Sequence, residues 1–535
     1  FETSTSAVTE AQMNQIYSQY EKDWKEWPVQ QGAPYIERNG ILGYQPPPTI
    51  TPVHGGRELI EKKHDEPGVA GADPSFPADQ VIWTVYNDLD RSATLAFSGS
   101  EPLGLEVQVT LWAYKGYNAL GNIYFKKVKL INKGGVDIGG GRKGSFWVDS
   151  MFVGQWSDPD VGDVSDDLLG CDTVLSLGFA YNSRSADREF GEFNLPPPAV
   201  GYDFLQGPIV PGLPTDSAVF DLKRVRGKKN LAMTSFTYDP QVRGGGFTFD
   251  PRLRLWRQLQ GFMPDPPPAP WRLYPHPPGV SPTKFPLSGD PVTRSGFVDG
   301  LGTDYSPAPG DRRFLMSTGP FTLAPGDTQE ILIATVAGLG ADHLSSISAL
   351  KFYDRAAKRS FRGLFDVARA PVQPKAQAVE LDREIILEWG TDLKQVEETE
   401  RRIISGEYAF EGYNVYQLPR TSARLEDGVK LATFDVANDV SSIVDETFDL
   451  NQGLVVPTVV QRGSNEGVQR YIRISRDYIK EEYGGVRLNN GEEYHFAVTA
   501  YNYSRHPFAS PRSLESTPVL LKVKPRVPFG VKLNL

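Results

Sequence analysis

The sequence predicts a mainly β protein: a large N-terminal antiparallel β domain with two peripheral helices, followed by a second, smaller β domain. A chain of 535 residues is too long for a single hydrophobic core. Its 43 prolines, 52 glycines and 11% aromatic residues are typical of short strands joined by many turns. We therefore expect more than one domain and little helix.

Residues 1–78 are predicted to form a helix followed by an irregular arm. Apolar side chains recur at spacings of three and four within residues 9–27, at Met13, Ile16, Tyr20 and Trp24. Pro28 ends this pattern. Residues 30–78 are rich in proline and glycine and show little periodicity, which favours an irregular segment lying along a surface.

A large β-rich domain is expected over residues 79–368. In residues 105–114 apolar residues alternate with Glu106, Gln108 and Thr110, as they do in a strand with one buried face. Further strands are expected at residues 81–86, 122–131, 146–152, 173–181, 314–321 and 330–337. Residues 342–365 are predicted to form the second helix, with Asp342 as its N-cap.

Proline is dense in residues 194–214 and 264–282. Because proline lacks the amide hydrogen and fixes φ, we expect neither a helix nor a central strand in either segment. The second segment is predicted to be a rigid loop held on the domain by Trp271 and Tyr274. Two other interpretations remain open: a polyproline ligand for a partner's groove, and aromatic rings that stack on sugars.

A linker at residues 369–376 separates this domain from a second one at residues 377–525, and residues 526–535 form a C-terminal tail. Short strands are expected at residues 384–389, 412–417 and 494–501. Trp389, GYNVYQ at 412–417 and NGEEYHFAVTAYN at 490–502 resemble a fibronectin type III-like β-sandwich, with Tyr494 in the place of its corner tyrosine. An insertion at 391–408 and a helix-like stretch at 475–483 depart from that family.

Several strings in residues 79–354 resemble uncharacterised secreted proteins of Bacteroidota-type bacteria, many of them exported by type IX secretion. The strings include DQVIWTVYND at 79–88, GQWSDPDVGDVSDDLLGCDTVLSLGFAYN at 154–182 and GDRRFLMSTGPFTLAPGDTQE at 310–330. This resemblance implies an extracellular or cell-surface location and carries no established activity. Proteins of this group commonly end in a sorting domain, and none is visible before Leu535, so we expect a processed, truncated or differently exported chain.

Six aspartates fall within the fifteen residues 158–172, and no Lys or Arg occurs between Gly144 and Ser183. Crowded carboxylates repel one another, and Ca²⁺ takes about six to eight oxygen ligands, so we predict a Ca²⁺ site here. Its predicted ligands are Asp158, Asp160, Asp163, Asp166, Asp167 and Asp172. The loop is not an EF-hand, because Gly162 and Leu169 stand where ligands are required. Two alternatives are aspartates that cap turns, and a catalytic carboxylate pair.

No catalytic motif is visible, so we expect no catalytic residues and no enzyme activity. The GxGxxG pattern at 139–144 is followed by a strand-like stretch rather than a helix, which favours a hairpin tip over a nucleotide site. Cys171 is the single cysteine and is expected to be a buried packing residue. A net charge of −10 argues against nucleic acid as a partner, and no apolar run is long enough to span a membrane.

Together these observations predict a secreted or cell-surface structural or adhesive protein, stabilised by calcium and part of a surface layer, fibre or filament. The alternatives are an extracellular glycan-binding protein and a secreted hydrolase. Expected partners are further copies of the chain, other surface proteins, or glycans. Aromatic residues of the N-terminal arm would contact a neighbouring copy, or else wrap their own domain: Tyr17, Tyr20, Trp24, Trp27 and Tyr35.

Overall fold

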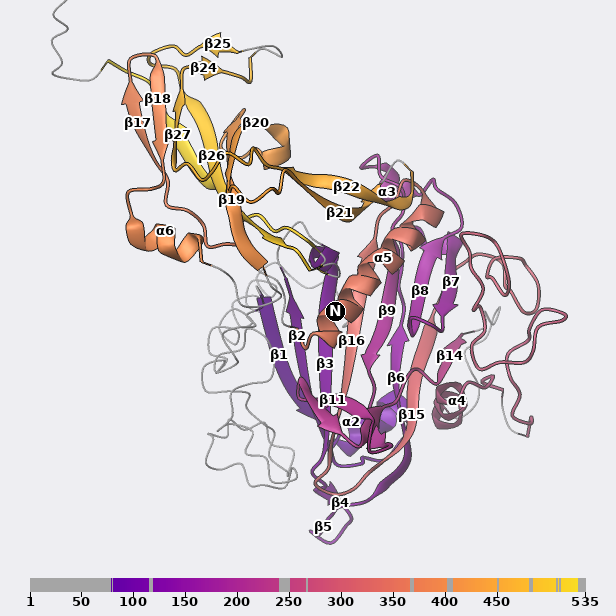
Figure 1. The fold of residues 1–535 in the computed structure, drawn as a ribbon. Helices are drawn as coiled ribbons and strands as arrows, with labels where there is room; N and C mark the ends of the chain where they lie inside the picture. Colours follow the sequence, from indigo (N-terminus) through magenta and orange to yellow (C-terminus); the bar gives the residue numbers. More distant parts are fainter. Residues whose placement is uncertain are drawn as a thin grey trace, which may run out of the picture. The chain divides into compact units, whose positions relative to one another are not determined.

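The computed structural model describes residues 78, 80–114, 119–239, 251–265, 268–365, 370–401, 408–449, 452–480, 485–506, 509 and 511–527 (Figure 1). The chain forms two compact units, one comprising Phe1–Phe365 with Leu450–Gly453 and the other Asp366–Asp449 with Leu454–Leu535. Both units are mainly β, as predicted. The predicted helix at residues 9–27 and the arm up to residue 77 lie outside the described residues.

A seven-stranded antiparallel sheet is the centre of the larger unit. Its strand order is β1-β2-β3-β16-β9-β8-β7. The alternation in residues 105–114 appears as strand β2, paired with its sequence neighbours β1 and β3 as a meander. The bounds in this order are β1 Gln80–Asn87, β2 Leu105–Ala113, β3 Ile123–Asn132, β16 Thr328–Gly338, β9 Ala199–Gln206, β8 Leu177–Asn182 and β7 Asp167–Asp172.

A second sheet of three strands packs against one face of the first, in the order β14-β15-β6. Its strands are β14 Ser235–Tyr238, β15 Phe314–Leu323 and β6 Val148–Ser157. The core between the sheets is apolar: Phe204 and Ile331 from the seven-stranded sheet meet Phe236 and Met316 from the smaller one. Gly178 lets the sheets approach closely, because a Cβ at this position would lie 2.8 Å from Met316 Sδ.

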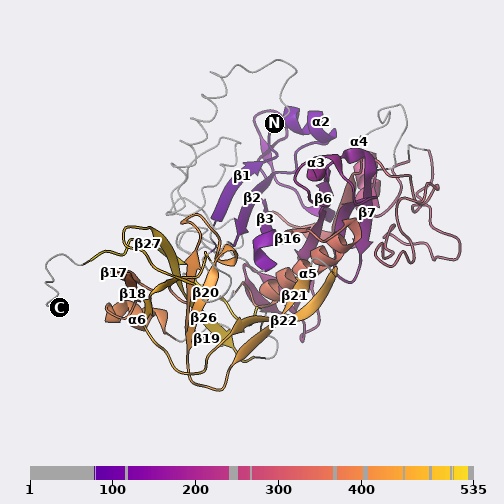
Figure 2. The same ribbon diagram turned by 90° about the horizontal axis from the view of Figure 1, so that it is seen from above.

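Helix α5, His343–Arg362, runs over β16 and β9 on the opposite face of the seven-stranded sheet (Figures 1 and 2). The predicted N-cap is confirmed: Asp342 accepts a hydrogen bond from Ser345 N at 2.7 Å, and Ser345 Oγ accepts one from Asp342 N. Ile347 and Leu350 are fully buried. The apolar side of the helix therefore holds it on the sheet.

Charged side chains share the helix-bearing face of this sheet. Lys129 Nζ lies 3.1 Å from Asp221 Oδ1 and 3.6 Å from Glu330 Oε1, and all three residues are buried. Glu330 also accepts a hydrogen bond from the backbone N–H of Asp221 at 2.7 Å. Buried charges are tolerated when they are paired in this way, so this face combines paired charges with apolar residues such as Trp112 and Phe125.

The prediction that residues 194–214 contain no central strand is wrong. Strand β9 occupies Ala199–Gln206 and pairs with β16 on one side and β8 on the other. The prolines of this segment stand before Ala199 and after Gln206, so every residue of the strand keeps its amide hydrogen for the ladder. The prolines lie at the two ends of this segment, and they do not prevent the eight residues between them from forming a strand.

The remaining elements of the larger unit are short. The GxGxxG stretch forms the tip of hairpin β4–β5, as predicted, with Gly139, Gly140 and Gly141 at positive φ. Helix α4 packs against β15. The prediction of two peripheral helices is incomplete, because helices α2, α3 and α4 were not expected. The bounds are α2 Arg91–Ser98, α3 Arg188–Gly191, α4 Pro251–Leu259, η2 Ala119–Asn122, η3 Val164–Asp166, β4 Val136–Asp137, β5 Lys143–Gly144, β10 Ile209–Pro211, β11 Ser217–Phe220, β12 Lys223–Arg226 and β13 Lys228–Asn230.

The two largest sheets of the smaller unit share one hydrophobic core. Their orders are β17-β18-β23 and β20-β19-β26-β27. Leu387 and Trp389 at the end of β18 pack with Tyr413, Phe496 and Val523 of the second sheet. The bounds are β17 Gln377–Leu381, β18 Glu384–Glu388, β23 Tyr471–Ile474, β20 Val429–Asp435, β19 Tyr408–Leu418, β26 Tyr494–Ser504 and β27 Val519–Val523.

Short additional helices and strands lie between the strands of these two sheets in the sequence. Helix α6, Leu393–Thr399, lies in the predicted insertion at 391–408. The expected helix-like stretch at 475–483 is wrong at its start, where Arg476–Asp477 forms strand β24, because a ladder with β25 competes successfully with local helix propensity. The other additions are β21 Ser442–Asp449, β22 Leu454–Arg462, β25 Val486–Arg487 and η5 Leu425–Asp427.

The smaller unit should fold by itself when residues 370–527 are expressed alone, because its two sheets enclose a complete core. We expect a single cooperative thermal transition by circular dichroism. A Phe496→Ala control, which removes a fully buried ring, should lower stability by about 3–5 kcal/mol. A fragment without a cooperative transition would show that the larger unit supplies part of its core.

Candidate metal centre

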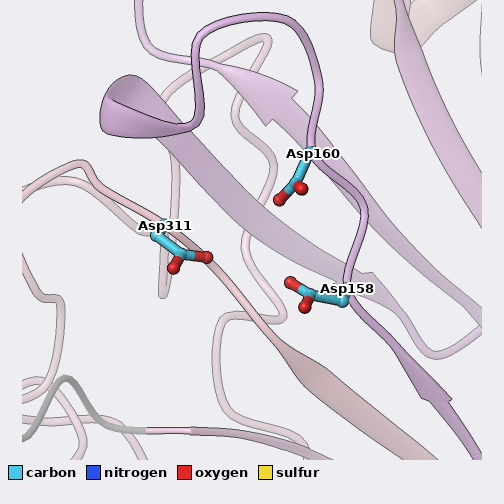
Figure 3. A group of neighbouring side chains, drawn as sticks. All are labelled: Asp158, Asp160 and Asp311. Carbon is cyan, nitrogen blue, oxygen red and sulfur yellow. The ribbon is translucent and has the colours of Figure 1, made fainter. Parts of the chain in front are cut away.

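Three aspartates from two distant segments converge in the larger unit. One carboxylate oxygen from each of Asp158, Asp160 and Asp311 lies within 4.8 Å of the others. Figure 3 shows the three side chains directed toward a common space. The register of the three-stranded sheet explains this meeting: Ser157 at the end of β6 pairs with Phe314 at the start of β15, so the residues just beyond each strand end are neighbours.

A buried ion pair orients the segment that carries Asp311. The side chain of Arg312 is 2% exposed, and its Nε donates to Asp299 Oδ2 at 3.0 Å. Asp299 also accepts a hydrogen bond from Leu169 N of β7 at 3.0 Å. Because successive side chains of an extended chain point to opposite sides, an inward Arg312 places Asp311 and Arg313 on the side of Asp158.

Arg313 supplies positive charge to this cluster. Its Nε donates to Asp158 Oδ2 at 3.0 Å, and its Nη1 donates to Asp311 Oδ2 at 2.9 Å. Burial raises the pKa of Asp158, the guanidinium of Arg313 opposes that shift, and the charges of Asp160 and Asp311 add to it. The guanidinium therefore relieves a carboxylate repulsion that a metal ion could relieve more fully.

The donor set fits a hard cation. All three ligating groups are carboxylates, the ligand type that Ca²⁺ prefers. Asp158 Oδ1 is buried and accepts no hydrogen bond from the part of the chain that the structure describes. An acceptor oxygen that has lost water and gained no donor is a ready ligand for a cation. The three residues could therefore hold Ca²⁺, with further oxygen ligands from backbone or water.

Asp167 is a buried carboxyl group close to the cluster of Asp158, Asp160 and Asp311. It is fully buried, and its backbone oxygen accepts a hydrogen bond from Gly310 N, next to Asp311. Burial raises the pKa of Asp167 to about 7; a backbone hydrogen bond from Val161 opposes the shift, and the charges of Asp166, Asp160 and Asp311 add to it. Asp167 is thus electrostatically coupled to the cluster without belonging to the group of three.

The other predicted ligands are engaged elsewhere. Asp163 caps η3 by accepting from Ser165 N at 3.1 Å. Buried Asp166 accepts hydrogen bonds from Asn182, Ser183 and Arg184. Asp172 pairs with Lys351 Nζ at 2.8 Å and accepts from two backbone amides, so its pKa falls below the usual value although burial opposes the shift. The turn caps of Asp163 and Asp172 agree with the alternative interpretation of the acidic stretch, whereas the ion pairs with Arg184 and Lys351 were not expected.

Two of the six predicted ligands, Asp158 and Asp160, thus meet a third carboxylate, Asp311, that the sequence analysis missed. Asp311 stands in GDRRF, just before a strand that was predicted. In an extended chain Arg312 faces the side opposite to Asp311 and Arg313, which was a usable signal for an inward and an outward side. The pairing of this strand with β6, more than 150 residues away in the chain, was not visible in any local pattern.

Trp271 and Tyr274, the candidate sugar-binding rings, do not form one exposed surface. Tyr274 is buried, and its hydroxyl donates to the backbone oxygen of Tyr238 at 2.7 Å. Trp271 is 44% exposed, with Phe262 against it at 5.3 Å between ring centroids and the Arg257 guanidinium 5.4 Å from its ring. The contacts of both rings hold the proline-rich segment against helix α4 and strand β14.

Cys171 lies in the core between the two sheets of the larger unit. Burial raises the pKa of its thiol, and the neighbouring charge of Asp172 raises it further. A thiol in this environment stays protonated at neutral pH and is a poor nucleophile. Its position is that of a packing residue.

Comparison with known proteins gives no relative for this chain. No family model matches it, and neither a curated protein nor a solved structure matches it. Within the described ranges, no helix has the length and apolar character needed to cross a membrane.

Replacing Arg312 by alanine should destabilise the larger unit strongly, because Asp299 would then carry a buried charge without its partner. We expect a loss of about 3–5 kcal/mol in the free energy of unfolding, measured by chemical denaturation. The matched control is Arg91→Ala, which breaks an exposed pair with Glu101 and should cost at most about 1 kcal/mol. Equal losses in the two variants would show that the Arg312–Asp299 pair does not organise this segment.

Proposed function

We propose that this chain is a secreted or cell-surface structural or adhesive protein, without enzymatic activity, whose larger unit is stabilised by Ca²⁺. The observation that carries this proposal is the convergence of Asp158, Asp160 and Asp311 on one point. A cation bound there would tie the loop after β6 to the segment before β15. Such a tie stabilises the folded state, because the site does not exist in the unfolded chain.

Arg313 competes with a bound cation for the carboxylates of Asp158 and Asp311. The guanidinium donates to Asp158 Oδ2 and Asp311 Oδ2, so Ca²⁺ has to displace it in order to use these two oxygens as ligands. The arginine side chain is 39% exposed and can therefore turn into solvent. The net affinity is the difference between carboxylate–calcium and carboxylate–guanidinium attraction, which favours a site that fills only where Ca²⁺ is plentiful, as it is outside cells.

A structural role is also supported by the ligand types. Among the residues described, the group of Asp158, Asp160 and Asp311 contains neither histidine nor cysteine. Catalytic zinc sites are built mostly from histidine with an open coordination position, whereas all-carboxylate sites suit Ca²⁺. The proposal therefore gives the ion a stabilising task rather than a chemical one.

For the smaller unit we propose a fibronectin type III-like module. Its two sheets combine strands one, two and five with strands four, three, six and seven when the inserted strands are left aside, which is the arrangement of that family. Tyr494 supports the same proposal: it stands at the start of β26, and its hydroxyl accepts a hydrogen bond from Asn489 N, a few residues upstream, at 3.0 Å. Such modules serve as spacers or binding platforms.

Removal of Ca²⁺ should lower the thermal stability of the protein. At a free Ca²⁺ concentration about 100 times Kd, binding adds about 2.7 kcal/mol, so the melting temperature should fall measurably when a chelator is added in excess. Asp160→Asn, which removes a ligand without breaking the Arg313 contacts, should weaken Ca²⁺ binding at least about tenfold in calorimetric titration.

The matched control is Asp163→Asn. This aspartate belongs to the same acidic stretch but caps η3, and asparagine caps equally well. Its Ca²⁺ affinity should stay close to that of the unchanged protein. Identical melting in Ca²⁺ and in chelator, or an equal effect of the two substitutions, would contradict a site at Asp158, Asp160 and Asp311.

The proposed assembly role depends on contacts between copies of the chain or with other surface proteins. Aromatic residues of the N-terminal arm, which lies outside the described residues, are the proposed anchors. Deleting residues 1–35 should therefore reduce particle size in light scattering while the melting temperature is unchanged. A deletion that lowers the melting temperature and leaves particle size the same would mean that the arm wraps its own domain.

A further inference from the structure

Helix α5 and strand β9 bring two carboxyl groups together in the interior of the larger unit. Asp203 stands in β9, Asp354 stands in the middle of α5, and both residues are fully buried. Burial and, after it, the charge of Asp354 raise the pKa of Asp203, so the two carboxyl groups lie within electrostatic reach of each other. Lys358, one turn further along the helix, places its Nζ 2.6 Å from Asp203 Oδ2.

The positive charge around this pair is insufficient for two carboxylates. On α5, Lys351 is held by Asp172 at 2.8 Å, and Arg355 is exposed. On β16, the residue opposite Asp203 is Ala334, and Glu330 on the same strand is matched by Lys127 and Lys129. On β8 the ionisable group is Tyr181, and on β9 it is Tyr202, which packs on the other face against Phe314. The 3₁₀ turn η2 carries no ionisable group.

A hydrogen bond between two carboxyl groups needs a proton, since an ionised carboxylate only accepts. Within the described part of the chain, both oxygens of Asp354 are buried and neither accepts a hydrogen bond from a donor group. A second negative charge at this place would be buried without a partner, at a cost of several kcal/mol. One lysine and one proton together neutralise the pair.

We propose that Asp203 and Asp354 hold one proton between them. This shared proton, called the proton lock below, stabilises the packing of α5 on the seven-stranded sheet in mild acid, and its loss in alkali weakens that packing. The proton lock is independent of the proposed cation site, because neither aspartate belongs to it.

Electrostatics give the direction of the effect. Burial raises the pKa of both Asp203 and Asp354 above the ordinary aspartate value, and Lys358 opposes the shift in each case. A raised folded-state pKa contributes stability that is complete below the pKa of an unfolded aspartate. That stability is lost as the pH rises through the folded-state pKa. The larger unit should therefore become less stable across this range.

The test compares Asp354→Asn with the unchanged protein by urea denaturation from pH 5 to pH 8. Asparagine imitates the protonated acid, so the variant should be more stable than the unchanged protein at pH 8. It should also release about one proton fewer on unfolding, obtained from the slope of stability against pH. Asp167 and Glu411, which also have a pKa raised to about 7, contribute equally to both proteins and cancel.

Two further variants separate the proton lock from simple weakening of the helix. Asp203→Asn should lose the same proton but be less stable, because Lys358 loses its charged partner. Ser345→Ala removes the side-chain hydrogen bond of the capping box that Asp342 N donates, and should lower stability while the slope between pH 5 and pH 8 is unchanged. If Asp354→Asn is less stable than the unchanged protein at pH 8 and keeps its full slope, both carboxyl groups are ionised and the proton lock does not exist.

Discussion

The buried pair between Arg312 and Asp299 determines where the candidate metal centre forms. It fixes the inward side of the segment before β15 and thereby turns Asp311 and Arg313 toward Asp158. Asp299 also binds the backbone of β7 through Leu169, so one carboxylate connects the edge of the seven-stranded sheet to the loop that completes the site. A pair placed in this way contributes little net stability, since desolvation offsets most of its attraction, but its geometry admits one arrangement of the segment.

The larger unit uses the two faces of one sheet for different purposes. On β3 and β16 the residues Val128 and Ile331 face the apolar core, whereas their neighbours Lys129 and Glu330 face the opposite side. The apolar face drives folding through burial of hydrocarbon surface. The other face buries charged groups such as Lys129 and Glu330 beside the apolar residues that hold α5, and these charged groups define positions more than they add stability. The proton shared by Asp203 and Asp354 belongs to this second group of interactions.

Local patterns predicted those parts of the fold that local physics controls. The alternation in residues 105–114 gave β2, and Asp342 marked the start of α5 because both depend on residues a few positions apart. The central strand β9 was missed because the prolines around it say nothing about the eight residues between them. Asp311 was missed for a different reason: its place beside Asp158 follows from a strand pairing that spans more than 150 residues. Of the six aspartates of the acidic stretch, Asp158 and Asp160 lie together. Asp163 caps a turn, as the alternative interpretation expected, whereas the ion pairs of Asp166 and Asp172 depend on distant or separately placed basic residues that the stretch does not reveal.

The central claim is that Asp158, Asp160 and Asp311 hold Ca²⁺ in place of the Arg313 guanidinium. The most direct measurement is a crystal structure of the protein grown in saturating Ca²⁺, with an anomalous difference map. The account predicts one peak about 2.3–2.6 Å from an oxygen of each of the three aspartates, and an Arg313 side chain turned into solvent. A map without a peak at this position, in which Arg313 still bridges Asp158 and Asp311, would contradict it.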